Sequence, residues 1–426
     1  MTAGNECRFG LLGRTLGHSW SPQIHALLGS TPYALVELEP QEVAGYVREG
    51  SWLGLNVTIP YKRDVVALAD ELSPRVAALG AANTLVRRPD GSVLAENTDV
   101  LGFEHLLESF CRARLDTTPQ QAFGGRKVLV LGSGGASEAL RYALERTVGA
   151  QVVVISRSGA DDYASIATRH ADAALVVNAT PVGMYPRCPA SPLEESTLAD
   201  LGELRGVVDI VYNPLRTGLV MMAERLGIPA VSGLGMLVAQ AFYASELFQG
   251  TELDPALVDQ IEADIERQMA NVVLIGMPGS GKTGAGRRLA HMVHRPFVDV
   301  DDAIELELGC SIPEFFAREG EAAFREEETR ALRAACGRSG LVIACGGGVV
   351  TRPENYEVLH QNGVIVMIDR PLEELATDGR PVSQSKGVAR IAQERMPLYR
   401  SWADVVLACT GSAAGDARAL QELFGL

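Results

Sequence analysis

One segment of the chain has the residue types and spacing that hold a nucleoside triphosphate. Gly276–Thr283 reads Gly-Met-Pro-Gly-Ser-Gly-Lys-Thr, between the apolar run Asn271–Ile275 and a helical pattern. In this arrangement backbone N–H groups surround phosphate oxygens, Lys282 reaches the β- and γ-phosphates, and the Thr283 hydroxyl binds Mg²⁺. Without a phosphate partner, a lysine is unfavourable at a helix start, because the helix dipole is positive there. The segment predicts an ATP and Mg²⁺ site whose contacts are Gly279, Ser280, Gly281, Lys282, Thr283 and Gly284.

A second glycine-rich turn has the pattern of a dinucleotide site. Gly132–Ala139 reads Gly-Ser-Gly-Gly-Ala-Ser-Glu-Ala and follows the apolar run Lys127–Leu131. Glycines between a strand and a helix permit a tight turn and bring a pyrophosphate close to the helix N-terminus. Taken alone, the pattern also fits an ordinary turn between a strand and a helix.

The next strand favours one of the two common dinucleotides. After Gln151–Ile155, an NAD enzyme carries an acid that binds the ribose 2′-hydroxyl, but this chain has Arg157 between two serines. A cation and hydroxyl groups suit a 2′-phosphate, and no carboxylate is there to repel it. A solvated surface arginine is the alternative interpretation. We expect NADP(H), bound by Gly132, Ser133, Gly134, Gly135, Ala136, Ser156, Arg157 and Ser158.

Buried parallel sheets are expected to position both glycine-rich turns. Short apolar runs such as Lys127–Leu131 and Val207–Val211 recur along the chain, each followed by a turn and a helical pattern. Continuous apolar strands of this kind imply sheets buried on both faces, so the fold class is doubly wound α/β. An amphipathic pattern over Asp254–Gln268 leads into Asn271–Ile275 without a flexible linker. We therefore place a domain boundary near Met269.

The bulk composition excludes several classes of protein. A chain of 426 residues exceeds the usual size of one hydrophobic core, so two or more domains are expected. The net charge of −15 argues against a nucleic-acid partner, because a phosphate-reading surface needs a basic excess. The seven cysteines are scattered without a Cys-x-x-Cys pair, which is typical of thiols in a reducing compartment. With no signal-like start and no run of ~18 apolar residues, we expect a cytoplasmic protein with no membrane partner.

Polar residues are unusually dense before the dinucleotide turn. They lie in the segments Ser19–Pro22, Asn56–Lys62, Asn83-Thr84 and Asn97–Asp99. Individually, such residues commonly serve as turns and helix caps. In order, they resemble the shikimate dehydrogenase family, and the resemblance covers about residues 8 to 250. Its later segments are Asn178–Met184, Asp209–Tyr212 and Gly233–Gln240.

The resemblance implies an NADPH-dependent reduction of 3-dehydroshikimate to shikimate. It makes Lys62, beside Asp99, the catalytic group. Hydride addition to a ketone builds negative charge on oxygen, which a nearby ammonium can stabilise and protonate while a carboxylate orients that ammonium. The implied substrate contacts are Ser19, Ser21, Thr58, Lys62, Asn83, Asp99, Tyr212 and Gln240. Ile210 and Gly233 are implied to lie near the nicotinamide.

Two positions depart from the pattern of that family. Val100 follows Asp99 where glycine is usual, and Glu96 precedes Asn97 where a small residue is common. We expect such changes to act on the backbone of the pocket or on the choice of substrate. Val100 keeps open a quinate-type dehydrogenase that uses NAD, against which Arg157 argues.

The segments around and after the ATP site resemble the shikimate kinase family, in order from about Asn271 to the C-terminus. They are Phe297–Asp301, Phe324-Arg325, Gly346–Gly348, Arg380-Pro381 and Arg395–Tyr399. Asp299 and Asp301 stand at i and i+2 at the end of a predicted strand, so we expect both to point to one face. Capping of the following helix is the alternative for this pair.

The second resemblance implies phosphoryl transfer from ATP to shikimate. Asp301 would bind the shikimate hydroxyls and orient the attacking one, and Asp299 would help to hold Mg²⁺ through water. Gly347 would approach the ring. Arg325 and Arg395 would clamp the substrate carboxylate, since guanidinium groups bind carboxylates bidentately.

The departures from the kinase family lie around its lid. Arg380 would be the lid arginine that neutralises phosphoryl charge as the lid closes. Leu375–Asp378 lacks the arginine that the family often places beside the adenine, and Val and Ser follow Pro381 where two leucines are usual. We expect weaker ATP affinity or altered lid kinetics, with the chemistry retained.

The chain is therefore predicted to be a bifunctional α/β enzyme of three domains. A substrate lobe (1–100) and a Rossmann-like NADP domain (101–268) precede a P-loop kinase domain (269–426) with a parallel, five-stranded sheet. The predicted catalytic residues are Lys62, Asp99, Lys282, Asp301 and Arg380. The alternatives are a dehydrogenase half with relaxed quinate/shikimate specificity, or one half that senses a ligand without catalysis. Monomer and homodimer are both left open.

Overall fold

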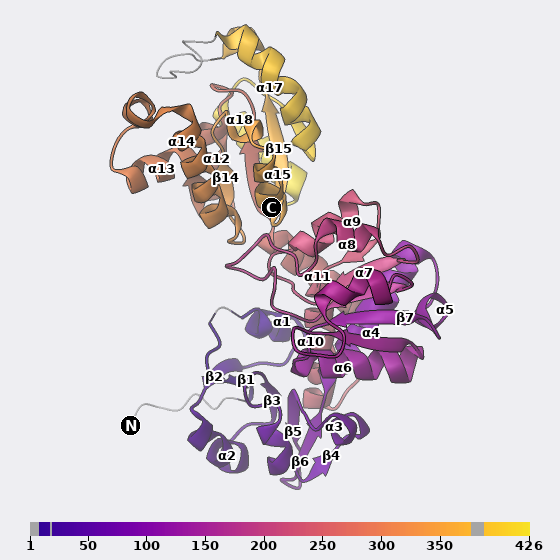
Figure 1. Cartoon of the computed structure of the whole chain (residues 1–426). Helices are drawn as coiled ribbons and strands as arrows, with labels where there is room; N and C mark the ends of the chain where they lie inside the picture. Colours follow the sequence, from indigo (N-terminus) through magenta and orange to yellow (C-terminus); the bar gives the residue numbers. More distant parts are fainter. Residues whose placement is uncertain (1–7, 18, 376–386) are drawn as a thin grey trace. The chain divides into compact units, whose positions relative to one another are not determined.

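The computed structural model describes residues 8–17, 19–375 and 387–426 (Figure 1). The chain divides into two compact units. The first contains Met1–Pro181, Pro192–Tyr212 and Met222–Asp264. The second contains Val182–Ser191, Asn213–Met221 and Ile265–Leu426. The division falls a few residues before the expected boundary at Met269, and it gives the second unit two short segments from earlier in the chain.

The first unit begins with a mixed six-stranded sheet in the order β2-β1-β3-β5-β6-β4. β1 is parallel to β2 and β3, whereas β5 is antiparallel to β3 and β6. The strands are β1 Phe9–Gly13, β2 Tyr33–Glu37, β3 Gly54–Val57, β4 Glu71–Leu72, β5 Thr84–Arg87 and β6 Val93–Glu96. Its helices are α1 Ser21–Leu27, α2 Pro40–Glu49 and α3 Pro74–Leu79, with a 3-10 turn η1 at Asp64–Leu68.

A second sheet of the first unit is parallel throughout, in the order β11-β10-β9-β7-β8. The strands are β7 Lys127–Leu131, β8 Gln151–Ile155, β9 Leu175–Asn178, β10 Gly206–Asp209 and β11 Ala230–Val231. The helices are α4 Thr98–Phe110, α5 Pro119–Phe123, α6 Gly135–Ala143, α7 Ile166–Arg169, α8 Glu195–Ala199, α9 Gly218–Arg225, whose first residues belong to the second unit, and α10 Leu234–Gln249. Shorter turns are η2 Cys111–Leu115, η3 Leu144–Val148 and η4 Tyr163–Ser165. The apolar runs at β7 and β8 are confirmed as strands.

Two helices, α4 and α10, pack closely and connect the two sheets of the first unit. A Cβ at Gly102 would lie 2.8 Å from the Met236 carbonyl oxygen and 3.0 Å from the Gln240 Cβ. Towards its C-terminal end, α10 packs on the first sheet, where a Cβ at Gly54 would overlap the Phe248 ring. Gly102 therefore permits the close approach that sets α4 against α10.

The second unit is built on a parallel, five-stranded sheet, as the sequence predicts. The strand order is β13-β14-β12-β15-β16. The strands are β12 Asn271–Ile275, β13 Phe297–Asp299, β14 Val342–Ala344, β15 Gly363–Asp369 and β16 Val405–Ala408. The helices are α11 Ala256–Met269, which begins in the first unit, then α12 Lys282–Met292, α13 Val300–Leu308, α14 Ile312–Cys336, α15 Glu354–His360, α17 Val388–Trp402 and α18 Ala413–Phe424. Two 3-10 turns are η5 Val349–Thr351 and η6 Leu372–Glu374.

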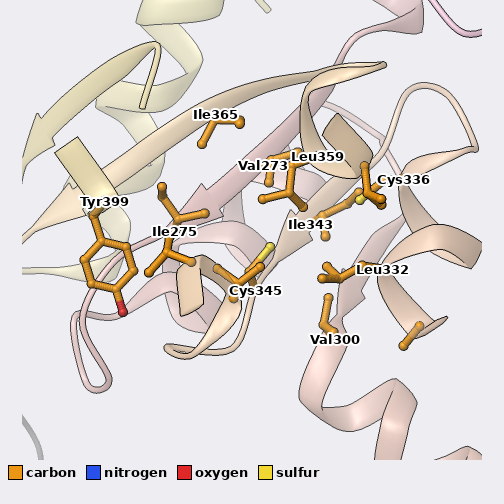
Figure 2. Close-up of a cluster of buried hydrophobic side chains, with 14 of the residues drawn as sticks. Val273, Ile275, Val300, Leu332, Cys336, Ile343, Cys345, Leu359, Ile365 and Tyr399 are labelled. Atoms are coloured by element: carbon orange, nitrogen blue, oxygen red, sulfur yellow. The ribbon is translucent and has the colours of Figure 1, made fainter. Parts of the chain in front are cut away.

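A continuous apolar cluster fills one face of this parallel sheet (Figure 2). Val273 and Ile275 of β12 are fully buried together with Ile343 and Ile365 of the neighbouring strands. Leu332 of α14 covers them. Each Å² of apolar surface that is buried stabilises the folded state by about 25 cal/mol, so such a cluster is the main stabilising contribution to this unit. Among the described helices, none is long and apolar enough to cross a membrane.

One local prediction is wrong. The strand expected to run to Asp301 ends at Asp299, and α13 begins at Val300. The Asp299 side chain accepts a hydrogen bond from the Asp301 backbone N–H at 3.1 Å, so it caps the helix. An aspartate beside free N–H groups favours a helix N-cap over strand continuation. The two carboxylates are therefore placed by a helix start and not by strand alternation.

Candidate active sites

A lysine, a carboxylate and an amide meet at the start of α4. Lys62 lies in the turn after β3, and its Nζ is 2.5 Å from Asp99 Oδ2. Asn83 Nδ2 donates to the other carboxylate oxygen of Asp99 at 2.9 Å. The two charged side chains are 27% and 17% exposed, so the pair is accessible to a small ligand. An ammonium has three N–H donors, and the bond to Asp99 uses one of them.

Buried hydroxyl groups fix the amide of Asn83. Its Oδ1 accepts hydrogen bonds from the Thr98 backbone N–H at 2.7 Å and from Thr84 Oγ1 at 3.1 Å. Asn83, Thr84 and Thr98 are all buried. Because buried polar groups with several partners have one well-defined geometry, this cluster holds the Asp99 carboxylate in place. Asp99 itself stands in the first turn of α4, where the helix dipole favours a negative charge.

The other predicted substrate contacts come from neighbouring elements. Gln240 lies on the face of α10 that packs against α4 at Gly102. On α4, Gly102 is about one helical turn beyond Asp99. Thr58 directly follows β3, and its backbone N–H donates to the Leu12 carbonyl at 2.9 Å. Their contact with substrate stays a prediction.

The serines at the start of α1 are close to each other. Ser19 Oγ accepts a hydrogen bond from the Ser21 backbone N–H at 3.2 Å, and Ser21 is buried. Helix α1 packs on α10, where His25 Nδ1 and Ser245 Oγ are 3.0 Å apart. Tyr212, which follows β10, is half-buried, and burial raises the pKa of its hydroxyl. The roles of Ser19, Ser21 and Tyr212 also remain predictions.

The two residues that depart from the dehydrogenase pattern, Glu96 and Val100, contact residues outside the Lys62–Asp99–Asn83 cluster. Glu96 is buried, and its carboxylate accepts two bonds of 3.0 Å from Arg75 and one of 2.8 Å from Ser73. Val100 is 1% exposed and belongs to the apolar core of α4. The buried charge of Glu96 is therefore paired, and Val100 serves packing.

The first glycine-rich turn is shaped for close approach of a ligand. Gly132 has a φ of 102°, and a Cβ there would lie 2.9 Å from Thr180 Cγ2. At Gly134 and Gly135, where α6 begins, an added Cβ would meet no described atom within 4 Å. Ser133 is exposed, and Ala136 is half-buried. Open backbone at the N-terminus of a helix fits a pyrophosphate group.

Other residues of the predicted dinucleotide site lie directly after β8 and β10, at the same edge of the parallel sheet as the glycine-rich turn. Ser156 is buried, whereas Arg157 and Ser158 are exposed at the end of β8 and available to a 2′-phosphate. The Gly233 N–H donates to the Val211 carbonyl at 3.0 Å. A Cβ at Gly233 would lie 2.1 Å from the Ile210 carbonyl oxygen, so only glycine fits there.

The second glycine-rich turn holds its lysine folded over the loop. Lys282 is 8% exposed, and its Nζ donates to the carbonyls of Gly276 at 2.9 Å and Met277 at 3.0 Å. Gly279 and Gly281 have φ values of 87° and 98°, which favour glycine. Ser280 is fully buried, and its hydroxyl has no hydrogen-bond partner among the described residues. A loop with open N–H groups, a lysine and a spare hydroxyl fits a chain of phosphates.

An oxygen pair suited to Mg²⁺ lies at the start of α12. Thr283 Oγ1 donates to Asp299 Oδ2 at 2.6 Å. Within the described residues, no group of three His, Cys, Asp or Glu side chains could hold a metal ion by itself. Mg²⁺ commonly binds one or two protein oxygens together with substrate phosphates and water, so this pair fits it.

A pair of acids, the fully buried Glu328 and the half-buried Asp301, lies beside the phosphate loop, and only Asp301 was predicted from the sequence. A Cβ at Gly346 would lie 2.7 Å from both Asp301 Oδ1 and Glu328 Oε1, which places the two carboxylates side by side. Burial, together with the negative charges of Glu328 and Asp299, raises the pKa of Asp301 to about 6. Burial also raises the pKa of Glu328, which is fully buried. The sequence did offer a signal for Glu328, because an acid three residues after Arg325 on the same helix can pair with that arginine.

Two arginines, Arg325 and Arg395, lie at the glycine segment beside this acid pair. Arg325 Nη1 donates to Glu328 Oε2 at 2.7 Å, and Arg395 Nη1 donates to the Gly347 carbonyl at 2.8 Å. Both are largely buried, and the Nε atom of each lacks a hydrogen-bond partner among the described residues. A Cβ at Gly348 would overlap the Arg325 guanidinium. Spare guanidinium donors fit a small carboxylate. Arg380, predicted as the lid arginine, lies outside the described residues.

Comparison with known proteins finds two enzyme families along the chain. A family model for the shikimate dehydrogenase substrate binding domain matches residues 11–85, and one for shikimate kinase matches residues 278–423. The shikimate dehydrogenase (NADP(+)) of Clostridium perfringens is 33% identical over 279 residues, which are 61% of this chain and 98% of that protein.

Two solved structures are similar to the first part of the chain. Shikimate 5-dehydrogenase from Thermus thermophilus, in complex with NADP(H) and shikimate, has 30% identity and a TM-score of 0.51, covering 61% of this chain and 99% of that one. Quinate dehydrogenase from Corynebacterium glutamicum, in complex with NAD, has 28% identity and a TM-score of 0.53, covering 61% and 98%. The chain thus belongs to the shikimate dehydrogenase family, continues into a shikimate kinase domain, and is a bifunctional shikimate-pathway enzyme that uses NADP(H), ATP and Mg²⁺.

Proposed function

We propose that the Lys62–Asp99–Asn83 cluster is the reaction centre for reduction of 3-dehydroshikimate. NADPH, when bound, supplies the hydride. Lys62 stabilises the negative charge that develops on the ketone oxygen and donates a proton to it, and Asp99 keeps the ammonium in place. The supporting observation is the 2.5 Å contact of Lys62 with Asp99, both partly exposed above a buried hydrogen-bond network.

We propose that the second unit transfers the γ-phosphoryl group of ATP to the shikimate formed by the first. Arg325 and Arg395 hold the carboxylate with their spare N–H groups. Asp301, beside the phosphate loop, accepts the proton of the attacking hydroxyl, and its raised pKa keeps it a usable base near neutral pH. Lys282 neutralises phosphate charge, while Thr283 and Asp299 would hold Mg²⁺. Arg380 would add positive charge to the transferring group.

A coupled assay tests both halves in one experiment. The whole chain receives 3-dehydroshikimate, NADPH, ATP and Mg²⁺, and NADPH oxidation and ADP formation are followed together. Both signals are expected. NADPH oxidation without ADP formation shows that the kinase half is inert, as in the sensor alternative, or has another substrate. If neither signal appears, the dehydrogenase half is at fault, and added shikimate then tests the kinase half by itself.

A quinate-type dehydrogenase is a second candidate for the first unit. It is favoured by the similarity to a quinate dehydrogenase crystallised with NAD. Arg157 is exposed directly after β8, where an NAD enzyme carries an acid, and this favours NADP(H). Initial rates with shikimate or quinate, each with NADP⁺ or NAD⁺, separate the two. Higher kcat/KM for quinate with NAD⁺ would overturn our assignment.

We further propose that the chain works in the cytoplasm on small molecules alone, with neither nucleic acid nor membrane as a partner. The net charge of −15 supports this, because such a surface repels nucleic acid and acidic lipids. Light scattering of the purified chain decides between monomer and homodimer.

A further inference from the structure

The Glu96 carboxylate accepts hydrogen bonds from three residues of the first sheet and its helices. Glu96 is the last residue of β6 and is 7% exposed. Its Oε1 accepts from Ser73 Oγ at 2.8 Å and from Arg75 Nε at 3.0 Å, and its Oε2 accepts from Arg75 Nη2 at 3.0 Å. The same Oε1 accepts from the Asn97 backbone N–H at 2.6 Å. The last bond is the one that reaches the dehydrogenase centre, because Asn97 directly precedes α4.

The start of α4 is placed by residues outside that helix. Asn97 is its N-cap, a position whose side chain usually accepts a hydrogen bond from the first turn. Here the Asn97 side chain makes no such bond, and its Nδ2 donates to the Ala81 carbonyl at 2.9 Å instead. Two other bonds hold the helix start, one from the Asn97 N–H to Glu96 and one from the Thr98 N–H to Asn83 Oδ1. Asp99 is the next residue along the chain.

The backbone around Glu96 also supports the two side chains that contact Asp99. The Asn83 N–H donates to the Glu96 carbonyl at 3.2 Å. The Lys62 carbonyl accepts from the Ala82 N–H at 2.8 Å. Glu96 therefore touches the segment that carries Asn83 through its backbone and the segment that carries Asp99 through its side chain.

Arg75 allows a carboxylate to occupy this position. A buried carboxylate without a cation is costly, and Arg75 supplies two N–H groups and a positive charge. The Arg75 side chain is 32% exposed, whereas that of Glu96 is 9% exposed. A charged acceptor binds a backbone N–H at a helix start more strongly than a neutral one does. The ion pair thus supplies a strong acceptor for the Asn97 N–H.

We propose that Glu96 is a positioning residue of the dehydrogenase, which fixes the start of α4 through the Asn97 N–H and so holds Asp99 against Lys62. It acts through the backbone and not by contact with the substrate. Such an effect is measurable, because a displacement of about 1 Å can lower an enzymatic rate about 10²-fold. This inference rests on the proposed Lys62–Asp99–Asn83 reaction centre.

Two substitutions of similar size separate the hydrogen bond from the ion pair. Glu96→Gln keeps an oxygen that accepts from the Asn97 N–H, whereas Glu96→Met has only a thioether, which is a weak acceptor. Both remove the charge that pairs with Arg75, and urea unfolding measures the stability that each variant loses. NADPH oxidation by the full chain is then measured with 3-dehydroshikimate under conditions in which both variants are folded.

The two variants should differ in kinetics. We expect Glu96→Met to lower kcat at least about tenfold and to raise KM for 3-dehydroshikimate, because Asp99 moves relative to Lys62. Glu96→Gln should keep kcat within about threefold of the unmodified chain. KM for NADPH should stay unchanged in both, since the glycine-rich turn lies on the other sheet of the unit. A smaller folded fraction would lower kcat and leave both KM values as they were.

A matched control is available on a neighbouring strand. Glu71 lies on β4, which pairs with β6, and its exposed carboxylate forms an ion pair with Arg88. Glu71→Met makes the same chemical change where no bond leads to α4, and it should change neither kcat nor either KM.

The possible failures are distinct. If Glu96→Met and Glu96→Gln have the same kcat, or if Glu96→Met lowers kcat without a change in KM for 3-dehydroshikimate, Glu96 serves only the fold. The inference is then overturned, and the assignment of Lys62 and Asp99 stands. If the unmodified chain does not oxidise NADPH with 3-dehydroshikimate, the proposed reaction centre is wrong, and this inference is lost with it.

Discussion

At the scale of single residues, each reaction centre is a charged side chain whose position is set by hydrogen bonds around it. Lys62 and Asp99 are aligned by Asn83, whose amide is fixed by two buried threonines. Asp301 is placed by the cap that Asp299 provides to α13. The reactive groups are therefore pre-organised before substrate arrives, which removes reorganisation from the reaction.

Loss of the Lys62 ammonium should abolish only the first reaction. Lys62→Ala removes the proton donor, so kcat for NADPH oxidation should fall about 10²- to 10⁴-fold. ADP formation from added shikimate should stay at the level of the unmodified chain. The two rates are measured in separate assays. A kinase rate that falls in parallel would show that the two centres are not independent.

The kinase should lose activity in acid because of Asp301. With a pKa raised to about 6, the carboxylate becomes protonated below that pH and no longer accepts a proton from shikimate. We expect kcat/KM to fall about tenfold per pH unit below pH 6. The profile is measured from pH 5 to 8. Glu328→Gln, which removes a neighbouring negative charge, should move the acid limb to lower pH, and an unmoved limb would contradict the pairing of these acids.

The same pKa has a consequence for stability, with a sign opposite to that of a salt-bridged acid. The folded pKa of Asp301 lies above its ordinary value, so the folded state binds the proton more tightly than the unfolded chain does. The stabilising contribution of the protonated form is present at low pH and is lost as pH rises through about 6. Asp301→Asn should remove that loss, which urea unfolding of the chain at pH 4.5 and 7.5 would reveal.

At the scale of elements, helix starts and tight glycine contacts decide where the functional groups lie. Helix α4 presents Asp99 in its first turn and packs on α10 through Gly102. In the second unit, α12 begins at Lys282, and Gly348 leaves the space that the Arg325 guanidinium occupies. The sheets form the framework of each unit, and the helices determine where the functional side chains lie.

A methyl group at Gly102 should disturb the dehydrogenase at a distance from its substrate. Gly102→Ala brings a Cβ within 2.8 Å of the Met236 carbonyl, so α4 must shift away from α10. We expect a loss of about 1–3 kcal/mol in unfolding free energy and a higher KM for shikimate. Gly45→Ala is the matched control, because a Cβ there meets no described atom within 4 Å and alanine favours a helix. Equal stability of the two variants would contradict the packing argument.

The sequence predicted elements better than it predicted contacts. Apolar runs gave β7, β8 and β12 with their observed ends, because buried parallel strands need continuous apolar residues. Asp301 was assigned to a strand, since the capping preference of Asp299 competes with strand alternation over so short a segment. Glu328 was missed, although it stands three residues after Arg325, because its proximity to Asp301 arises only in the folded chain. The roles of the predicted substrate contacts stay predictions.

At the scale of the whole molecule, one chain carries two nucleotide sites that serve one metabolite. Each unit has its own parallel sheet, with a glycine-rich turn at the carboxyl end of an interior strand. Because the product of the first reaction is the substrate of the second, the fusion keeps the two steps at equal stoichiometry. Equal stoichiometry alone does not require transfer of shikimate between the sites.

Calorimetric titration of the whole chain with shikimate shows whether each unit binds this metabolite in a pocket of its own. We predict two equivalents bound per chain, with Asp99→Ala and Asp301→Ala each removing one of them and leaving the other. A stoichiometry of one or none in the unmodified chain, or the loss of both sites in either variant, would contradict the account.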